Sequence, residues 1–311
     1  MLLKKLTGNP LLAGTLSALL LIVPLAQIYL LFPLQLIAPL PVFLVALRLG
    51  IKAGALAAVV PLLFCLGILG QLSTPLIITY LVMIWFPLLA AWLVQGGWRP
   101  VQILGGGYLL ALALLVLFLL GSMLTGNAML EAVHSQMMVS KQAIMTTLAG
   151  AEGADAQLLV EMGNSLDEAF RLFALLFPAL FLSSWYTIQV ANLLLARYLI
   201  IRWQMPLMPE QDLSSLRVPF FLVWPLIGCA MLALMASGSL QQLGLNLVLF
   251  LAIPYFFQGY SVVYRGFQHF KVSVFIRVIF YMILMTWSAA ILAVTLMGLL
   301  DTWMDFRKRL T

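Results

Sequence analysis

Long apolar runs alternate with short polar gaps along most of the chain. A helix needs about 20 apolar residues to cross a bilayer, and proline breaks a run because it removes a backbone donor. The runs predict nine membrane-spanning helices, at residues 11–32, 34–48, 51–71, 74–95, 101–124, 169–200, 218–237, 242–264 and 273–299. The predicted fold class is therefore all-α, a polytopic integral membrane helical bundle of about nine spans, with eight as the alternative.

One stretch, residues 125–168, departs from this pattern because it is polar and acidic. Within it Met129, Val133, Met137, Ile144 and Leu148 recur at near-helical spacing with polar residues between them. This periodicity predicts an amphipathic helix on the membrane face. A break at 150–153 and a second short helix at 154–166 are expected to follow, leading into the sixth span.

Composition supports residence in a bilayer. Of the 311 residues, 64% are hydrophobic and only 8% are charged, whereas soluble domains carry about 25% charged residues. The N-terminus is positive, but the apolar stretch behind it is too long for a cleaved signal peptide. We expect a multi-pass integral membrane protein.

The charges also predict an orientation. With the N-terminus in the cytoplasm, the loops on the inner side hold most of the basic residues, as membrane proteins require. The outer loops before residue 300 hold only Lys141 and Arg171, both close to acidic residues. The basic tail, Arg307 to Arg309, disagrees, because nine spans place it outside. The net charge of +6 thus reflects the basic residues of the inner loops and gives no indication of nucleic-acid binding.

Two regions follow from this drawing. Residues 1–201 form a six-span region that includes the extracytoplasmic segment 125–168, and residues 202–311 form a three-span region with the basic tail.

Polar side chains at membrane depth are costly and are the default functional candidates. In the sixth span Trp185, Gln189 and Asn192 are spaced i, i+4, i+7, so they share one helix face. An aromatic ring beside two amides could line a small-molecule pocket, or the amides could bond neighbouring helices. We take these three residues as ligand-binding candidates, with Gln258 as a weaker addition. Arg277 is expected to reach the membrane boundary, or alternatively to bind an anionic group.

Small residues at helical spacing predict close helix packing. Gly14 and Ala18 form one pair, and Gly50, Gly54 and Ala58 form a longer track. Packing within the chain is favoured over a partner interface.

Residues for chemistry are scarce. His134 and His269 lie in different polar segments without paired acids or cysteines at ligand spacing, so we expect no metal site and no cofactor. Asp301 and Asp305, one helical turn apart, suggest a helix end paired with Lys308 or Arg309. We expect no catalytic residues and no enzymatic activity.

Four stretches carry a family resemblance: PLPVFLVALRLGIKAG, NLLLARYLIIRW with the following LRVP, IPYFFQGYSVV, and GLLDTWMDFRKR. Together, in this order, they resemble the YybS-like family of bacterial membrane proteins. The resemblance implies that the first six spans are similar to the substrate-binding subunits of energy-coupling-factor vitamin transporters, which have six helices and both ends in the cytoplasm. In those transporters a small-residue track on the first helix contacts the coupling subunit, and Gly14 and Ala18 occupy a comparable place. The resemblance supplies no catalytic residues.

Two functions remain open at this point. The first is binding or transport of a small solute in a cavity between helices. The second is a non-transporting scaffold that engages other envelope proteins through its helical surface and residues 125–168. In either case the lipid bilayer is a partner of the chain.

Overall fold

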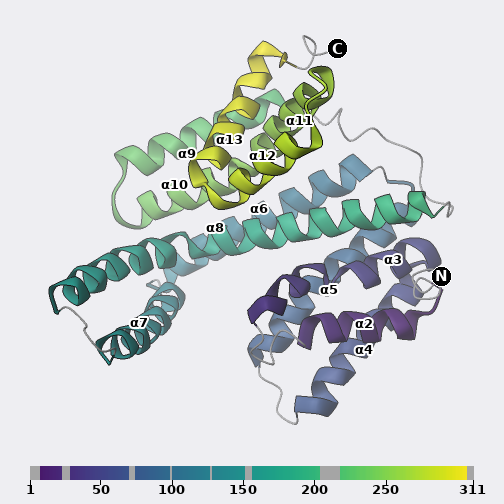
Figure 1. Cartoon of the computed structure of the whole chain (residues 1–311), viewed down its shortest axis with the longest axis horizontal. Coiled ribbons are helices and arrows are strands. Elements are labelled where there is room, and N and C mark those ends of the chain that lie inside the picture. The colour runs from purple at the N-terminus through teal and green to yellow at the C-terminus, as the bar shows by residue number, and fades with distance from the viewer. Residues whose placement is uncertain are drawn as a thin grey trace. The chain divides into compact units, whose positions relative to one another are not determined.

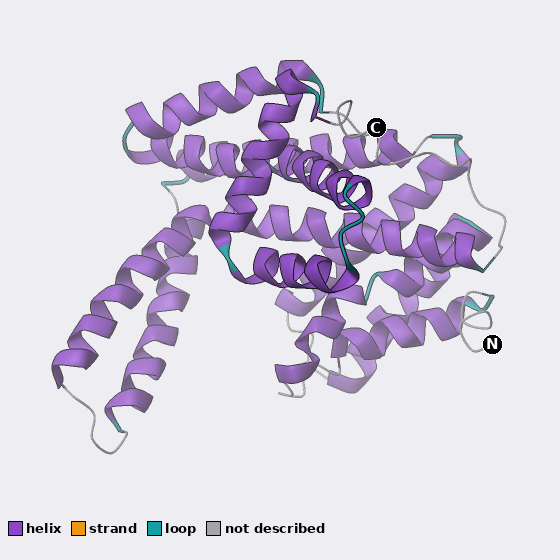
Figure 2. Cartoon of the chain, turned by 45° about the horizontal axis from the view of Figure 1, so that its top comes forward, coloured by secondary structure: helices purple, strands orange, loops and turns teal. Residues whose placement is uncertain are grey.

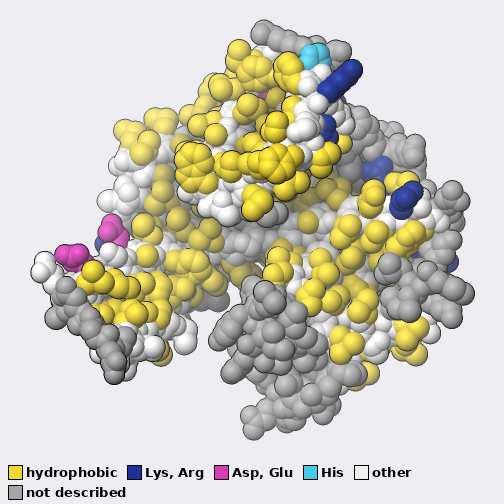
Figure 3. All heavy atoms as spheres, in the orientation of Figure 1, with side chains coloured by type: hydrophobic (Ala, Val, Ile, Leu, Met, Phe, Trp, Pro, Cys, Tyr) yellow, Lys and Arg dark blue, Asp and Glu magenta, His cyan; other side chains and the backbone are white. Residues whose placement is uncertain are grey.

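The computed structural model describes residues 8–22, 29–69, 74–98, 100–126, 128–150, 156–203 and 218–306. Every regular element in these ranges is a helix (Figure 2). The predicted all-α class is therefore confirmed for the described part of the chain. Large apolar side chains cover much of the visible surface (Figure 3), as expected for helices that face lipid.

Packing divides the chain into two compact units. Unit 1 comprises 1–111 and 184–213, and unit 2 comprises 112–183 and 214–311. Two long helices, α6 (Pro100–Leu124) and α8 (Ala156–Arg202), supply residues to both units (Figure 1). The predicted division at residue 201 separates the first six spans from the last three. It does not describe packing units, so it stays a prediction.

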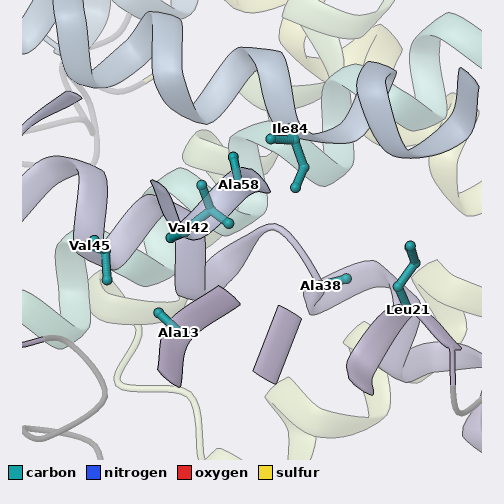
Figure 4. Close-up of a cluster of buried hydrophobic side chains, with 8 residues drawn as sticks. Ala13, Leu21, Ala38, Val42, Val45, Ala58 and Ile84 are labelled. Atoms are coloured by element: carbon teal, nitrogen blue, oxygen red, sulfur yellow. The ribbon is translucent and has the colours of Figure 1, made fainter. Parts of the chain in front are cut away.

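Unit 1 is built around short helices near the N-terminus. In chain order these are α2 (Pro10–Ile22), the 3-10 helix η2 (Tyr29–Ile37), α3 (Leu40–Leu49), α4 (Ile51–Leu69) and α5 (Thr74–Gln95). Their shared core is aliphatic (Figure 4). It consists of Ala13, Leu21, Ala38, Val42, Val45, Ala57, Ala58 and Ile84. Many of these side chains are small, so the helices approach closely.

Unit 2 contains a projecting helical hairpin and a five-helix group. The hairpin pairs α7 (Ala128–Ala149) with the first part of α8, running in opposite directions (Figures 1 and 2). After the 3-10 turn η4 (Phe220–Leu222), the group consists of α9 (Val223–Met235), α10 (Gly238–Leu251), α11 (Ile253–His269), α12 (Val274–Thr286) and α13 (Ser288–Met304).

By length and apolar composition, three helical stretches of the described chain can each cross a bilayer: Gln102–Leu124, Gln157–Arg202 and Gly238–His269. A fourth, Val274–Leu284 with Ser288–Met304, is bent by 105° at its break. Five shorter apolar stretches have 10–17 residues each: Pro10–Leu21, Pro33–Leu49, Ile51–Leu63, Met83–Gln95 and Phe220–Met235. The fold thus supports three to four spans, and nine crossings remain a prediction.

Several predicted boundaries need correction. The expected helix at 34–48 is short and irregular, because the 3-10 helix η2 ends at Ile37 and α3 begins at Leu40. Pro39 and Pro41 explain the break, since neither can donate a backbone hydrogen bond. The last predicted span is interrupted at Trp287, which is extended between α12 and α13.

The acidic stretch also differs from its prediction in one respect. A helix with a break after it is confirmed, since α7 ends at Ala149. However, the expected short helix at 154–166 is not separate, because α8 runs unbroken for 47 residues from Ala156. No glycine or proline interrupts residues 164–177, so the helix continues into the sixth span as expected.

The contacts of α7 with α8 involve residues outside the predicted amphipathic stripe. Lys141 forms an ion pair with Asp167 of α8 at 2.6 Å, and the Met145 side chain lies against Gly163. Ile144, expected on the stripe, is 41% exposed, and the side chain of Met129 lies outside the described residues.

Candidate functional site

The polar face predicted on the sixth span lies in the unit 1 part of α8 and is buried. Trp185 is 2% exposed, Gln189 is fully buried and Asn192 is 2% exposed. The structure therefore brings these three candidates together, as their helical spacing requires. Buried amides need hydrogen-bond partners, so the partners decide what this face can do.

The Gln189 amide bonds a carbonyl that a proline has freed. Its Nε2 donates to the Met83 carbonyl oxygen of α5 at 2.8 Å. In a regular helix that oxygen would accept from the residue four positions later, but here that residue is Pro87, inside α5. Gln189 thus replaces a backbone donor that the sequence of α5 cannot supply.

Asn192 does the same beside η2. Its Nδ2 donates to the Leu36 carbonyl at 2.7 Å and to the Ile188 carbonyl of its own helix at 2.8 Å. A 3-10 turn at Leu36 would need the N–H of the third residue on, which is Pro39. Hydrogen bonding between helices, one of the two predicted roles, therefore accounts for the NH2 groups of both amides.

Helix packing does not account for the oxygen atoms of the same two amides. Gln189 Oε1 and Asn192 Oδ1 are buried without a hydrogen-bond partner among the described residues. An unsatisfied buried polar atom costs about 1–3 kcal/mol. Two such oxygens, one turn apart on the same helix, can accept hydrogen bonds from a solute that carries N–H or O–H groups.

Aromatic rings pack against Trp185, which lies one helical turn before Gln189 on α8. Trp185 stacks on Trp85 of α5 with ring centroids 5.5 Å apart and planes 14° from parallel. Phe86 meets Trp185 edge-on at 5.8 Å and also contacts Phe43 of α3. These contacts hold α3, α5 and α8 together and set the rotamer of Trp185.

Gln258 is not part of this face. It lies on α11 in unit 2, where its Oε1 accepts from the Val218 backbone N–H at 2.9 Å. Its Nε2 donates to Asp301 Oδ2 of α13 at 3.0 Å. Asp301 is 5% exposed, so the helix end predicted at this aspartate is buried and bonded by a glutamine. The predicted partners Lys308 and Arg309 lie outside the described residues.

Asn246 of α10 is a buried polar side chain that the sequence did not single out as a candidate. It is fully buried. Its Oδ1 accepts from the Ala179 N–H at 3.0 Å, and its Nδ2 donates to the Leu175 carbonyl at 2.9 Å. These two backbone groups flank Pro178, which has no N–H to donate in this turn of α8. An amide in one apolar run, with a proline inside another, is the signal that could have found this clamp.

The predicted small-residue positions lie at close approaches within unit 1. A side chain on Gly14 of α2 would reach the Ala57 carbonyl oxygen of α4 at 2.5 Å. Ala57 is the fourth residue before Pro61, and Pro61 has no N–H to donate to the Ala57 carbonyl. Ala18 is fully buried, and Ala58 is 7% exposed in the core of Figure 4.

The longer track has two roles. Gly54 of α4 lies against Ala46 of α3 and the Leu88 side chain of α5. Gly50 ends α3 with a φ of 93°, a conformation that favours glycine.

Arg277 caps a helix. Its guanidinium donates to the carbonyls of Val272 at 3.0 Å and Phe267 at 3.3 Å, which follow or end α11. A cation at a helix C-terminus is favourable, so these bonds give Arg277 a structural role.

Comparison with known proteins agrees with the fold. Neither the curated proteins nor the solved structures contain a match, so the expected likeness to transporter subunits stays an expectation. Residues 12–302 match the sequence model of the family described as "Predicted membrane protein (DUF2232)". This match is consistent with the YybS-like resemblance. The chain therefore belongs to the DUF2232 family of membrane proteins.

Proposed function

We propose that this membrane protein binds a small solute at the buried polar face of α8, and carries it between the two sides of the bacterial inner membrane. One observation carries the proposal: Gln189 Oε1 and Asn192 Oδ1 are buried without partners among the described residues. Interhelical amides whose donors are used and whose acceptors are free are suited to a ligand that supplies donors.

The surroundings narrow the kind of solute. Trp85 and Trp185 offer flat apolar surfaces, and both amide acceptors repel anionic groups. A neutral solute with at least two N–H or O–H groups fits this chemistry. Because both side chains are almost fully buried, entry requires movement of a neighbouring element such as η2 or α5.

The proposal is for a non-enzymatic protein whose N-terminus is cytoplasmic and whose chain crosses the membrane about nine times. The basic residues of the predicted inner loops support this orientation. The first six of these spans would form the solute-binding region. Segment 125–168 would then lie on the outer side.

A ligand screen tests the proposal. The full chain, purified in detergent, is heated with a library of neutral metabolites and vitamins while unfolding is followed. A ligand that binds the folded state raises the unfolding temperature. We expect at least one solute to stabilise the wild type and to lose its effect on Gln189→Leu with Asn192→Leu.

Gln241→Leu is the matched control, since it also removes an amide that donates to a helix carbonyl, that of Ala233 in unit 2. The control variant should respond to the solute like the wild type. Stabilisation of all three proteins to the same extent, or of none by any solute, would refute the proposal.

A second candidate is the non-transporting scaffold. The observation that favours it is the acidic segment 125–168, which carries six of the ten acidic residues of the chain. Four of these six lie on α7 and the first part of α8, which form the hairpin. Acidic side chains are visible on it in Figure 3. Crosslinking in native membranes should capture a protein partner that is lost when 125–168 is deleted.

A further inference from the structure

The first turns of α8 present an apolar stripe that no described part of the chain covers. The stripe has the spacing i, i+4, i+7, i+11, i+14. Its members, all exposed, are Leu158, Met162, Ser165, Ala169 and Leu172. The helix face that contacts α7 is a different one, marked by Gly163 and Asp167. We call these five positions the outer stripe.

This spacing is that of a coiled-coil seam, in which apolar residues recur every 3.5 positions on average. Leu158 is 58% exposed and Leu172 is 49% exposed, so no residue that the structure describes occupies the seam. Residues that flank such a seam set partner choice by charge. Here the flanking residues on one side are Glu161 and Glu168, both exposed and seven positions apart.

The outer stripe lies where α8 extends beyond a bilayer. The stretch Gln157–Arg202 has 46 residues, which is about 69 Å of helix, against a hydrocarbon core of about 30 Å. The charged residues of the stretch before Arg197 all lie between Glu161 and Arg171. That end cannot reside in hydrocarbon, so its outer stripe is accessible to other proteins.

We propose that the outer stripe binds an amphipathic helix of another protein that carries lysine or arginine beside its own apolar seam. The inference rests on the scaffold candidate and is independent of solute binding. Two glutamates beside one seam favour a basic partner, and they disfavour an anionic bilayer surface.

A second copy of the chain fits less well. Antiparallel pairing of two outer stripes brings the glutamates of both copies to the same flank, where like charges repel. Parallel pairing sets Glu161 beside Leu166 of the other copy. Neither arrangement offers a basic residue, because the opposite flank of the stripe consists of Leu159, Leu166 and Phe173.

The experiment uses the full chain in nanodiscs of uncharged phosphatidylcholine and two labelled helical peptides of 21 residues. Both peptides carry leucine along the seam; one has lysine and the other glutamate at the flanking positions. We expect fluorescence anisotropy to show the lysine peptide bound at least about tenfold more tightly than the glutamate peptide. The lysine peptide gains two attractive charge pairs and the glutamate peptide meets two repulsive ones, a difference of about 1.4 kcal/mol in binding free energy. Glu161→Lys with Glu168→Lys should reverse the preference.

Two further variants separate charge from apolar contact. Leu158→Ser with Met162→Ser should weaken binding of the lysine peptide about tenfold or more, while Glu131→Lys on α7 should leave it unchanged. The inference is overturned if the stripe variants bind both peptides like the wild type. It is also overturned if the stripe instead drives self-association measured by light scattering, or binding of the chain to vesicles that contain phosphatidylglycerol.

Discussion

At the scale of single residues, the polar side chains of this membrane protein are matched to its prolines. Proline inside a helix frees a carbonyl four positions earlier, and in hydrocarbon no water can satisfy it. Gln189 bonds the carbonyl that Pro87 frees, and Asn246 bonds both backbone groups around Pro178. These amides therefore let kinked apolar helices pack without unsatisfied backbone.

Replacement of Asn246 tests this pairing. Asn246→Leu removes the side chain that bonds the Ala179 N–H and the Leu175 carbonyl, so we expect a loss of about 1–3 kcal/mol in the free energy of unfolding. Denaturation of the purified chain by SDS measures it. In a Pro178→Ala background this turn of α8 regains its backbone N–H and loses the proline ring, so the loss should shrink to less than half. An equal loss in both backgrounds would contradict the clamp.

The pair of Gln189 and Pro87 can be tested in the same way, by replacing the amide with and without the proline. Gln189→Leu should destabilise the chain by about 1 kcal/mol, because the Met83 carbonyl loses its donor. Pro87→Ala restores the N–H that this carbonyl lacks, so Gln189→Leu should cost much less in that background. The free oxygen of Gln189 makes the result informative for function as well. If the double variant is as stable as the wild type, the glutamine is dispensable for folding, and loss of a solute response can then be assigned to binding.

At the scale of elements, helix pairs in each unit are set by glycines that face backbone. On α11, a side chain on Gly259 would collide with the Val294 carbonyl of α13, and one on Gly298 would collide with the Tyr255 carbonyl. The Gln258 and Asp301 side chains bond one another at the same pair of helices. The crossing of α11 and α13 thus depends on two glycines and one polar contact.

We expect Gly298→Ala to lower the free energy of unfolding by more than about 2 kcal/mol, because the added methyl group has no space against backbone. Gly266→Ala is the matched control on α11, where nothing lies within 4 Å of the added atom; it should stabilise slightly or have no effect, since alanine favours helix. Thermal unfolding in detergent compares the two. Equal stability of both variants would show that α11 and α13 do not pack in this way.

At the scale of the whole molecule, the open question is which helices cross the bilayer. Three described stretches are long enough alone and a fourth is bent, whereas the apolar runs predict nine crossings. Short helices such as α2 and α3 pack into the core of unit 1, so they can be buried among protein without each crossing fully.

Cysteine accessibility in spheroplasts tests the proposed orientation. In a background with Cys65→Ala and Cys229→Ala, an impermeant maleimide should label Val139→Cys on α7, which is 60% exposed, from the outer side. Lys52→Cys, on the predicted inner loop, should react only after the membrane is permeabilised. Labelling of Thr311→Cys then distinguishes nine spans, which place the tail outside, from eight. The reverse pattern at Val139 and Lys52 would contradict the orientation.

The sequence by itself determined the helical class, several helix bounds and the shared face of Trp185, Gln189 and Asn192. These follow from local properties, namely the length of apolar runs, the places of glycine and proline, and the period of a helix. The structure agrees with the predicted bounds at the starts of α4 and α5 and at the end of α7.

Only the tertiary structure decided what the polar residues contact. Gln189 and Met83 are 106 positions apart, and Asn246 and Leu175 are 71 apart, so no local pattern links them. It likewise paired Gln258 with Asp301 and showed the predicted helix at 154–166 to be continuous with the sixth span. The physical reason is that a freed carbonyl takes whichever donor packing brings to it, and packing depends on the whole chain.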